Sequence, residues 1–178
     1  MNHYKIIFTG PVGAGKTTAI GSISDIPVVN TDENATDMTK QRKNATTVAM
    51  DYGAISLDGG ERIHLYGTPG QERFNFMWDI LTKGGLGLVL LLDNTRADPF
   101  QDMRFFLTSF ESFIAERKLA IGITRMDLQA SPTLEDYHEN VRKFGLNPPI
   151  FEIDARKKKD VSLLLQSLLY SLDPWLGA

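Results

Sequence analysis

The stretch Gly10-Pro11-Val12-Gly13-Ala14-Gly15-Lys16-Thr17 decides the fold of this chain. It fits the pattern of a glycine, four residues and then Gly-Lys-Thr, which is typical of a loop that binds phosphate groups. Residues 4–9 before it have the apolar character of a buried strand, and residues 16–24 after it begin a helix. Glycines let the backbone turn tightly, so that successive N–H groups face inward and attract an anion at the positive end of the helix dipole. The motif and its setting therefore predict a phosphate site, with a glycine-rich turn that binds nothing as the alternative.

Two side chains of this loop carry chemistry. The ammonium group of Lys16 is placed to reach the terminal phosphates of a nucleotide, and the hydroxyl of Thr17 is placed to hold a magnesium ion. The residues expected to contact the nucleotide at this end are Gly10, Gly13, Ala14, Gly15, Lys16, Thr17 and Thr18.

Composition limits the class of protein. The 178 residues are expected to form one domain, residues 1–178, with a full core. A net charge of −3, from 19 basic and 22 acidic residues, gives no nucleic-acid footprint. The absence of cysteine excludes disulfides, thiolate metal sites and cysteine nucleophiles. The longest apolar run, residues 86–92, is too short to cross a bilayer, and no lipid anchor motif is present. We expect no direct membrane anchor and, because the predicted ligand is a nucleotide, a cytoplasmic location.

Strand and helix patterns alternate along the chain, which predicts an α/β protein whose mostly parallel sheet is covered by helices on both faces. The expected strands are residues 4–9, 48–57, 62–66, 86–92, 119–123 and 149–153. The expected helices are residues 16–24, a short one ending near residue 81, one starting at Asp98-Pro99, 133–144 and 161–172. The turn Asp58-Gly59-Gly60 predicts one antiparallel hairpin. Residues 28–46 are polar and aperiodic, which indicates a functional or mobile loop, or else a disordered insertion.

Three further motifs follow or precede predicted strands at the edge where a nucleotide would lie. Thr47 can add its hydroxyl to magnesium and its N–H to the γ-phosphate, or be a plain strand residue. In the segment 67–74, the N–H of Gly70 can touch the γ-phosphate and Gln71 can orient a water molecule, or the segment can be a simple turn. Asp127 can accept two hydrogen bonds from guanine, a donor pair that adenine lacks, or it can cap a helix. Arg125 can lay its stem or guanidinium along the base.

These motifs together resemble the small Ras-like GTPases over nearly the whole chain. They are, in order, GPVGAGKT, TTVAMDYG, GTPGQERF, LLLDN, TRMD and DAR. The stretch 47–74 is similar to Rab-type proteins, and several of its variants more closely resemble a bacterial branch that includes the gliding-motility GTPases and GTPases encoded beside roadblock-domain proteins. The resemblance implies a P-loop NTPase domain, a Ras-like three-layer sandwich with a mostly parallel six-stranded sheet and one antiparallel strand.

The resemblance also implies roles for single residues. Lys16 and Gln71 are the expected catalytic residues, Thr17 and Thr47 the expected magnesium ligands. The nucleotide is expected to be GTP or GDP. The residues expected to contact it beyond the phosphate loop are Thr47, Gly70, Thr124, Arg125, Asp127, Ala155 and Arg156.

Departures from the family pattern bear on metal binding and regulation. Gly67 stands where most of the family has an aspartate that supports magnesium, which weakens the expected metal shell. Val12 stands where Ras has glycine, and its side chain crowds the space of a Ras-type arginine finger. Thr124 and Arg125 replace asparagine and lysine. Asp154 stands where serine is common.

The function expected from the sequence is a GTP-binding switch that hydrolyses GTP slowly, with an unknown effector and a roadblock-domain regulator. Arg42 and Arg73 are candidates for an internal arginine finger, or are ordinary surface arginines. The rival functions are a guanine-nucleotide-binding scaffold that does not hydrolyse, favoured by Gly67 and Val12, and a P-loop ATPase or kinase.

Overall fold

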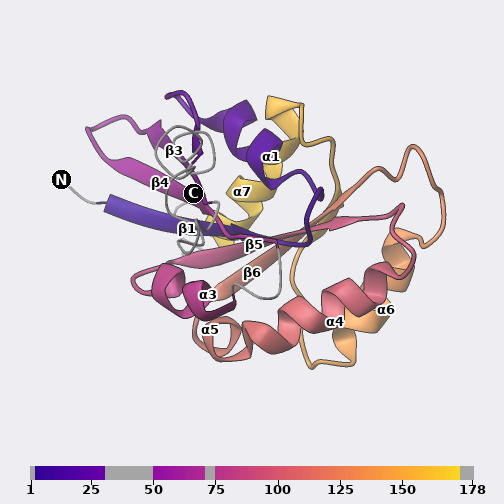
Figure 1. The fold of residues 1–178 in the computed structure, drawn as a ribbon. Helices are drawn as coiled ribbons and strands as arrows, with labels where there is room; N and C mark the ends of the chain where they lie inside the picture. The colour runs from indigo at the N-terminus through magenta and orange to yellow at the C-terminus, as the bar shows by residue number, and fades with distance from the viewer. Residues whose placement is uncertain (1–2, 31–49, 71–74, 173–178) are drawn as a thin grey trace, which may run out of the picture.

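The computed structural model of the chain describes residues 3–30, 50–70 and 75–172 (Figure 1). In chain order the strands are β1 (His3–Thr9), β2 (Val29–Asn30), β3 (Asp51–Ser56), β4 (Arg62–Gly67), β5 (Gly87–Asp93), β6 (Lys118–Thr124) and β7 (Ile150–Glu152). The helices are α1 (Lys16–Ile23), α3 (Asn75–Thr82), α4 (Pro99–Ser109), α5 (Glu111–Glu116), α6 (Leu134–Arg142) and α7 (Lys158–Leu172).

The strands form one sheet in the order β2-β3-β4-β1-β5-β6-β7. Strand β3 runs antiparallel to both of its neighbours, and the remaining pairs are parallel. The predicted fold class, a mostly parallel α/β sheet with one antiparallel strand, is confirmed. The sheet has seven strands and not six, because Val29 and Asn30 pair with Tyr52 and Asp51. The sequence predicts a loop over those two residues.

Helices cover both faces of the sheet and enclose two apolar clusters. Helices α1 and α7 lie on one face, and α3, α4, α5 and α6 lie on the other (Figure 1). The first cluster includes Ile6, Phe8 and Ile20, and the second includes Ile7, Leu90 and Phe106. Adjacent residues of β1 thus enter opposite clusters, as the period of two along a strand requires. Every residue of β5 is buried, which confirms the unbroken apolar run as a central strand.

Local capping explains several helix boundaries. Asp98 accepts a hydrogen bond from the N–H of Gln101 at 3.0 Å, and Pro99 opens α4. The phenylalanine-rich helix predicted from there is divided at Phe110, which ends α4 and precedes α5. Thr133 and Asp136 form a capping box that starts α6. Among the described residues, no helix has the length and apolarity needed to span a bilayer.

The sheet order places the loop after β1 at a crossover point. Strand β1 lies between β4 and β5, so the chain leaves it towards one side of the sheet and later returns on the other. Ligands of open α/β sheets bind beyond the carboxyl ends of the strands at such a point. The ends of β1, β4, β5 and β6 therefore frame the candidate site.

Candidate nucleotide site

The loop between β1 and α1 turns tightly at three glycines. Gly10, Gly13 and Gly15 have φ values of 145°, 79° and 105°, in the region that favours glycine. At Gly10 a Cβ atom would lie 2.1 Å from the backbone oxygen of Leu91. Gly15 precedes α1 without a side-chain cap, so the N–H groups of the first helical turn face the loop. This backbone is an anion cradle at a helix N-terminus.

Lys16 folds back over the loop that carries it. Its Nζ donates to the backbone oxygens of Gly10 at 2.7 Å and Pro11 at 2.9 Å. The side chain is buried, and burial lowers the pKa of Lys16 to about 8, although the charge of Asp51 acts in the opposite direction. An ammonium group has three protons, and the described hydrogen bonds use two of them. The remaining proton can meet a phosphate oxygen.

Thr17 is tied to a carboxylate on a neighbouring strand. Its hydroxyl donates to Oδ2 of Asp51 at 2.5 Å, and Oδ1 of Asp51 accepts from Nδ2 of Asn30 at 2.9 Å. Asp51 is only 7% exposed. The sequence alone gives Asp51 no role; its place beside Thr17 and opposite Gly67 appears when the strands are paired.

The oxygen donors at this point suit a magnesium ion. Hydroxyl and carboxylate oxygens are the hard ligands that magnesium prefers, and it commonly combines one or two of them with phosphate oxygens and water. Thr17 and Asp51 fit that requirement. The other predicted ligand, Thr47, lies outside the described residues, as do Gln71, Arg42 and Arg73.

The segment after β4 lies directly against the phosphate loop. A Cβ atom on Gly70 would be 2.6 Å from the backbone nitrogen of Val12 and 2.9 Å from Nζ of Lys16. The segment is anchored from both sides: Thr68 shares a hydrogen bond with Thr9 through their hydroxyls at 2.8 Å, and Trp78 donates to the oxygen of Pro69 at 3.3 Å. The structure therefore brings Gly70 to the phosphate loop, and its contact with a γ-phosphate stays a prediction.

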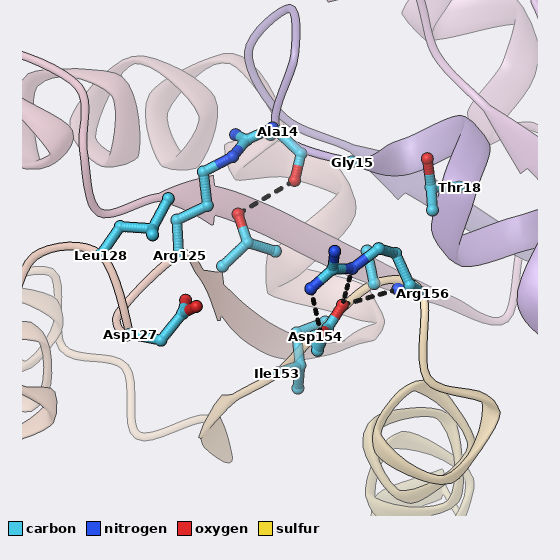
Figure 2. Close-up of a pocket in the computed structure, with 11 residues that line it drawn as sticks. Ala14, Gly15, Thr18, Arg125, Asp127, Leu128, Ile153, Asp154 and Arg156 are labelled. Atoms are coloured by element: carbon cyan, nitrogen blue, oxygen red, sulfur yellow. Dashed lines mark hydrogen bonds and ion pairs between the residues drawn. The ribbon is translucent and has the colours of Figure 1, made fainter.

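A cavity of about 380 Å³ opens beside the loop (Figure 2). Its walls come from the phosphate loop, the first turn of α1, the end of β6 and the end of β7. The lining residues are Ala14, Gly15, Thr18, Thr124, Arg125, Asp127, Leu128, Ile153, Asp154, Ala155 and Arg156. Every predicted nucleotide-contacting residue from the motifs TRMD and DAR lines this cavity.

Thr124 joins the cavity wall to the phosphate loop. It is buried at the end of β6, and its hydroxyl donates to the backbone oxygens of Ala14 at 3.1 Å and Leu92 at 3.2 Å. One hydroxyl proton is thus shared between two acceptors. The side chain thus ties the end of β6 to the phosphate loop.

Arg125 makes a second tie to the loop. Its backbone has a φ of 60°, and its Nη1 donates to the oxygen of Gly13 at 2.8 Å and forms an ion pair with Asp93. Burial raises the pKa of Asp93, but hydrogen bonds from Thr95 and the charge of Arg125 outweigh it and lower the pKa overall. The guanidinium thus lies against the loop at Gly13, and Arg125 also lines the cavity (Figure 2).

Two aspartates line the cavity and differ in their hydrogen-bond partners. Asp127 is exposed, points towards the cavity (Figure 2), and has no hydrogen-bond partner among the residues described. Asp154 accepts from the backbone N–H of Arg156 at 3.0 Å and from its Nε and Nη2 at 2.9 and 2.8 Å. These hydrogen bonds from Arg156 lower the pKa of Asp154. Arg156 thus neutralises Asp154 at the rim, a partner that the sequence did not reveal.

Comparison with known proteins identifies relatives of two kinds. Residues 27–171 match the family described as "Conserved hypothetical ATP binding protein". An uncharacterized protein of Methanocaldococcus jannaschii is 30% identical over 136 residues, which make up 75% of this chain and 77% of that protein. The Ras-related protein Rab-27A of Sus scrofa is 26% identical over 182 residues, covering 93% of this chain and 76% of that protein. Rab-1C of Dictyostelium discoideum is 27% identical over 160 residues, with coverages of 86% and 72%.

A solved structure supports the same fold. The bacterial selenocysteine-specific elongation factor EF-Sec superposes with a TM-score of 0.69 at 23% identity. The match covers 96% of this chain but 29% of that one, so the likeness concerns the fold. With the phosphate loop, the cavity and the sheet order in place, the fold is that of a P-loop GTPase with Ras-related relatives. Since four fifths of its length match the family model, the chain belongs to the family of conserved hypothetical ATP binding proteins.

Proposed function

We propose that this protein is a GTP-binding molecular switch that hydrolyses GTP slowly to GDP and phosphate. The observation that carries the proposal is the carboxylate of Asp127, which faces a cavity continuous with the phosphate loop and accepts no hydrogen bond from the described residues. A free carboxylate accepts hydrogen bonds and donates none. Guanine offers it two adjacent donors, N1–H and the exocyclic amine.

The family description favours a second ligand, ATP. Adenine offers a donor amine beside a ring nitrogen that carries a lone pair, and a carboxylate opposite that lone pair is repelled. The family match begins at residue 27, so it includes Asp127 but not the phosphate loop. We therefore favour the guanine nucleotide.

Base preference is tested by binding. We expect GTP and GDP to raise the melting temperature and ATP to have little effect at equal concentration. Asp127→Asn is expected to prefer xanthine nucleotides, because an amide can donate to the extra carbonyl of xanthine. Asp58→Asn, on the exposed turn between β3 and β4, is the matched control. Stabilisation by ATP and not by guanine nucleotides, or an unchanged base preference in Asp127→Asn, would refute the assignment.

In the proposed reaction the chain supplies charge and position. The loop N–H groups and Lys16 hold the β- and γ-phosphates and neutralise the charge that grows on the γ-phosphate as water attacks. Magnesium, when bound, adds Lewis-acid stabilisation of the same phosphates. By resemblance to the Ras-like family, Gln71 orients the attacking water and Thr47 contacts the γ-phosphate and the metal. Asp127 fixes the base, and the backbone N–H of Ala155 donates to the guanine oxygen.

A slow rate is expected for as long as no arginine finger reaches the γ-phosphate. Such a finger typically adds about 10³–10⁵ to the rate. Val12 projects from the loop and is 59% exposed, in the space through which a Ras-type finger would enter. We propose that a roadblock-domain partner activates hydrolysis by repositioning Arg42 or Arg73, on the strength of the resemblance to the bacterial branch.

Hydrolysis is tested by single-turnover phosphate release. We expect a slow rate for the wild type, a lower one for Gln71→Leu, and stimulation by a roadblock-domain protein that Arg42→Ala or Arg73→Ala removes. If the wild type and Gln71→Leu are equally inert with and without the partner, the protein is a binding scaffold and not a GTPase. If both proteins still bind guanine nucleotides, the lack of hydrolysis is not caused by a loss of binding.

A further inference from the structure

The position of the missing aspartate is occupied from the neighbouring strand. Gly67 ends β4 at the position where, by the resemblance to the Ras-like GTPases, an aspartate is expected, and its register partner on β3 is Asp51. A Cβ atom on Gly67 would lie 3.1 Å from both Cβ and Oδ2 of Asp51. The carboxylate of Asp51 thus fills the space that a side chain at residue 67 would enter.

The hydrogen bond from Thr17 points to what this carboxylate does. A hydroxyl has one proton and two lone pairs. By donating its proton to Oδ2 of Asp51 at 2.5 Å, Thr17 leaves its lone pairs directed away from the carboxylate. That is the state in which a hydroxyl can ligate a cation.

Burial and a second hydrogen bond hold the carboxylate in place. Asp51 is 7% exposed, and Asn30 on β2 donates to its other oxygen at 2.9 Å. The charge of Lys16 lies close enough to interact with it. A buried carboxylate needs such partners, and a hydroxyl, an amide and an ammonium group supply them.

We propose that Asp51 is the carboxylate of the magnesium site and replaces, from strand β3, the group that Gly67 lacks on β4. The proposal rests on the proposed binding of a guanine nucleotide and adds to it a metal-holding residue. Asp51 and Thr17 hold the ion together, and Asn30 orients Asp51.

The test measures how strongly magnesium retains the nucleotide, a quantity independent of hydrolysis. The dissociation rate of a fluorescent GDP analogue is measured in excess magnesium and in excess EDTA. For the wild type we expect slow release in magnesium and faster release in EDTA. For Asp51→Asn we expect the ratio of the two rates to fall by about 10–100-fold, the usual cost of losing a metal-supporting partner. Its release rate in EDTA is expected to match the wild type, and Asp58→Asn to keep the full ratio.

An exchange of the two side chains makes the test specific. In the double variant Asp51→Gly with Gly67→Asp, the Asp51 atoms that crowd residue 67 are removed and the carboxylate moves to β4. The end of the Ile20 side chain, whose Cδ1 would lie 3.2 Å from the new Cβ, has to shift by a few tenths of an ångström. We expect this variant to recover part of the magnesium effect that Asp51→Asn loses.

The outcomes are distinguishable. The proposal is overturned if Asp51→Asn keeps the wild-type effect of magnesium on nucleotide release. It is also overturned if the exchange variant folds but its nucleotide release does not respond to magnesium. If Asp51→Asn does not fold, the exchange variant decides. The proposal treats a carboxylate on β3 and one on β4 as equivalent, so failure of the exchange variant to fold also counts against it. Failure of the wild type to bind any guanine nucleotide would instead refute the proposed function.

Discussion

Replacing Thr124 by valine tests how the base side of the site supports the phosphate loop. Valine keeps the size and branching of threonine but removes the hydroxyl. The oxygens of Ala14 and Leu92 then lose a shared, buried donor. Leaving a buried acceptor without a partner costs about 1–3 kcal/mol. For a chain of this size that corresponds to a fall in melting temperature of about 2–12 °C.

The nucleotide adds a second readout. Ala14 belongs to the loop that binds phosphate, so part of the lost free energy is expected as weaker GDP binding, by at most about 150-fold if all 3 kcal/mol appear there. Thr124→Ser keeps the hydroxyl and is the control for the lost methyl group. The assays are urea unfolding without ligand and calorimetric titration with GDP. If Thr124→Val matches the wild type in both while Thr124→Ser is impaired, the methyl group and not the hydrogen bond supports the loop.

Three further results are expected. Gly10→Ala forces a Cβ into the oxygen of Leu91 and is expected to destabilise the fold by about 1–3 kcal/mol or more and to abolish nucleotide binding, measured by denaturation and titration. Lys16 has a folded-state pKa of about 8 against 10.5 when unfolded, so the unfolded chain binds more protons between these values. The wild type is therefore expected to gain stability relative to Lys16→Met as pH rises through that window, by up to about 1.4 kcal/mol per pH unit in urea titrations; a flat difference would contradict the assigned burial. Trp78→Phe keeps an aromatic ring but loses the hydrogen bond to Pro69, and we expect a loss of about 1 kcal/mol in unfolding free energy and faster amide exchange at residues 68–70.

Elements with a strong local signal are predictable from the sequence alone. The phosphate loop, the buried strand β5 and the helix started by Thr133 all depend on residues within a few positions of one another. Strand β2 depends on a distant partner, because Val29 and Asn30 become a strand only by pairing with β3. The break at Phe110 between α4 and α5 likewise has no marker such as proline or glycine.

The candidate site divides in the same way. The residues that line the cavity follow from motifs, since each motif ends a strand at the same edge of the sheet. The hydrogen-bond and ion-pair partners of those residues cannot be predicted from the motifs. The tie from Arg125 to Gly13 and Asp93, and the reach of Asp51 to Thr17, connect positions 30 or more residues apart. Only the paired sheet brings them together.

The ties from Thr124 and Arg125 have a consequence for how a ligand is captured. They fix the spacing between the cavity and the phosphate loop before any molecule binds. A nucleotide then behaves as a bivalent ligand: once one end docks, the other faces its subsite at an effective concentration set by the stiffness of these ties. The second contact then needs little further ordering of the site, so its free-energy cost is small. We therefore expect a nucleoside and a pyrophosphate added together to bind far more weakly than the intact nucleotide that joins them.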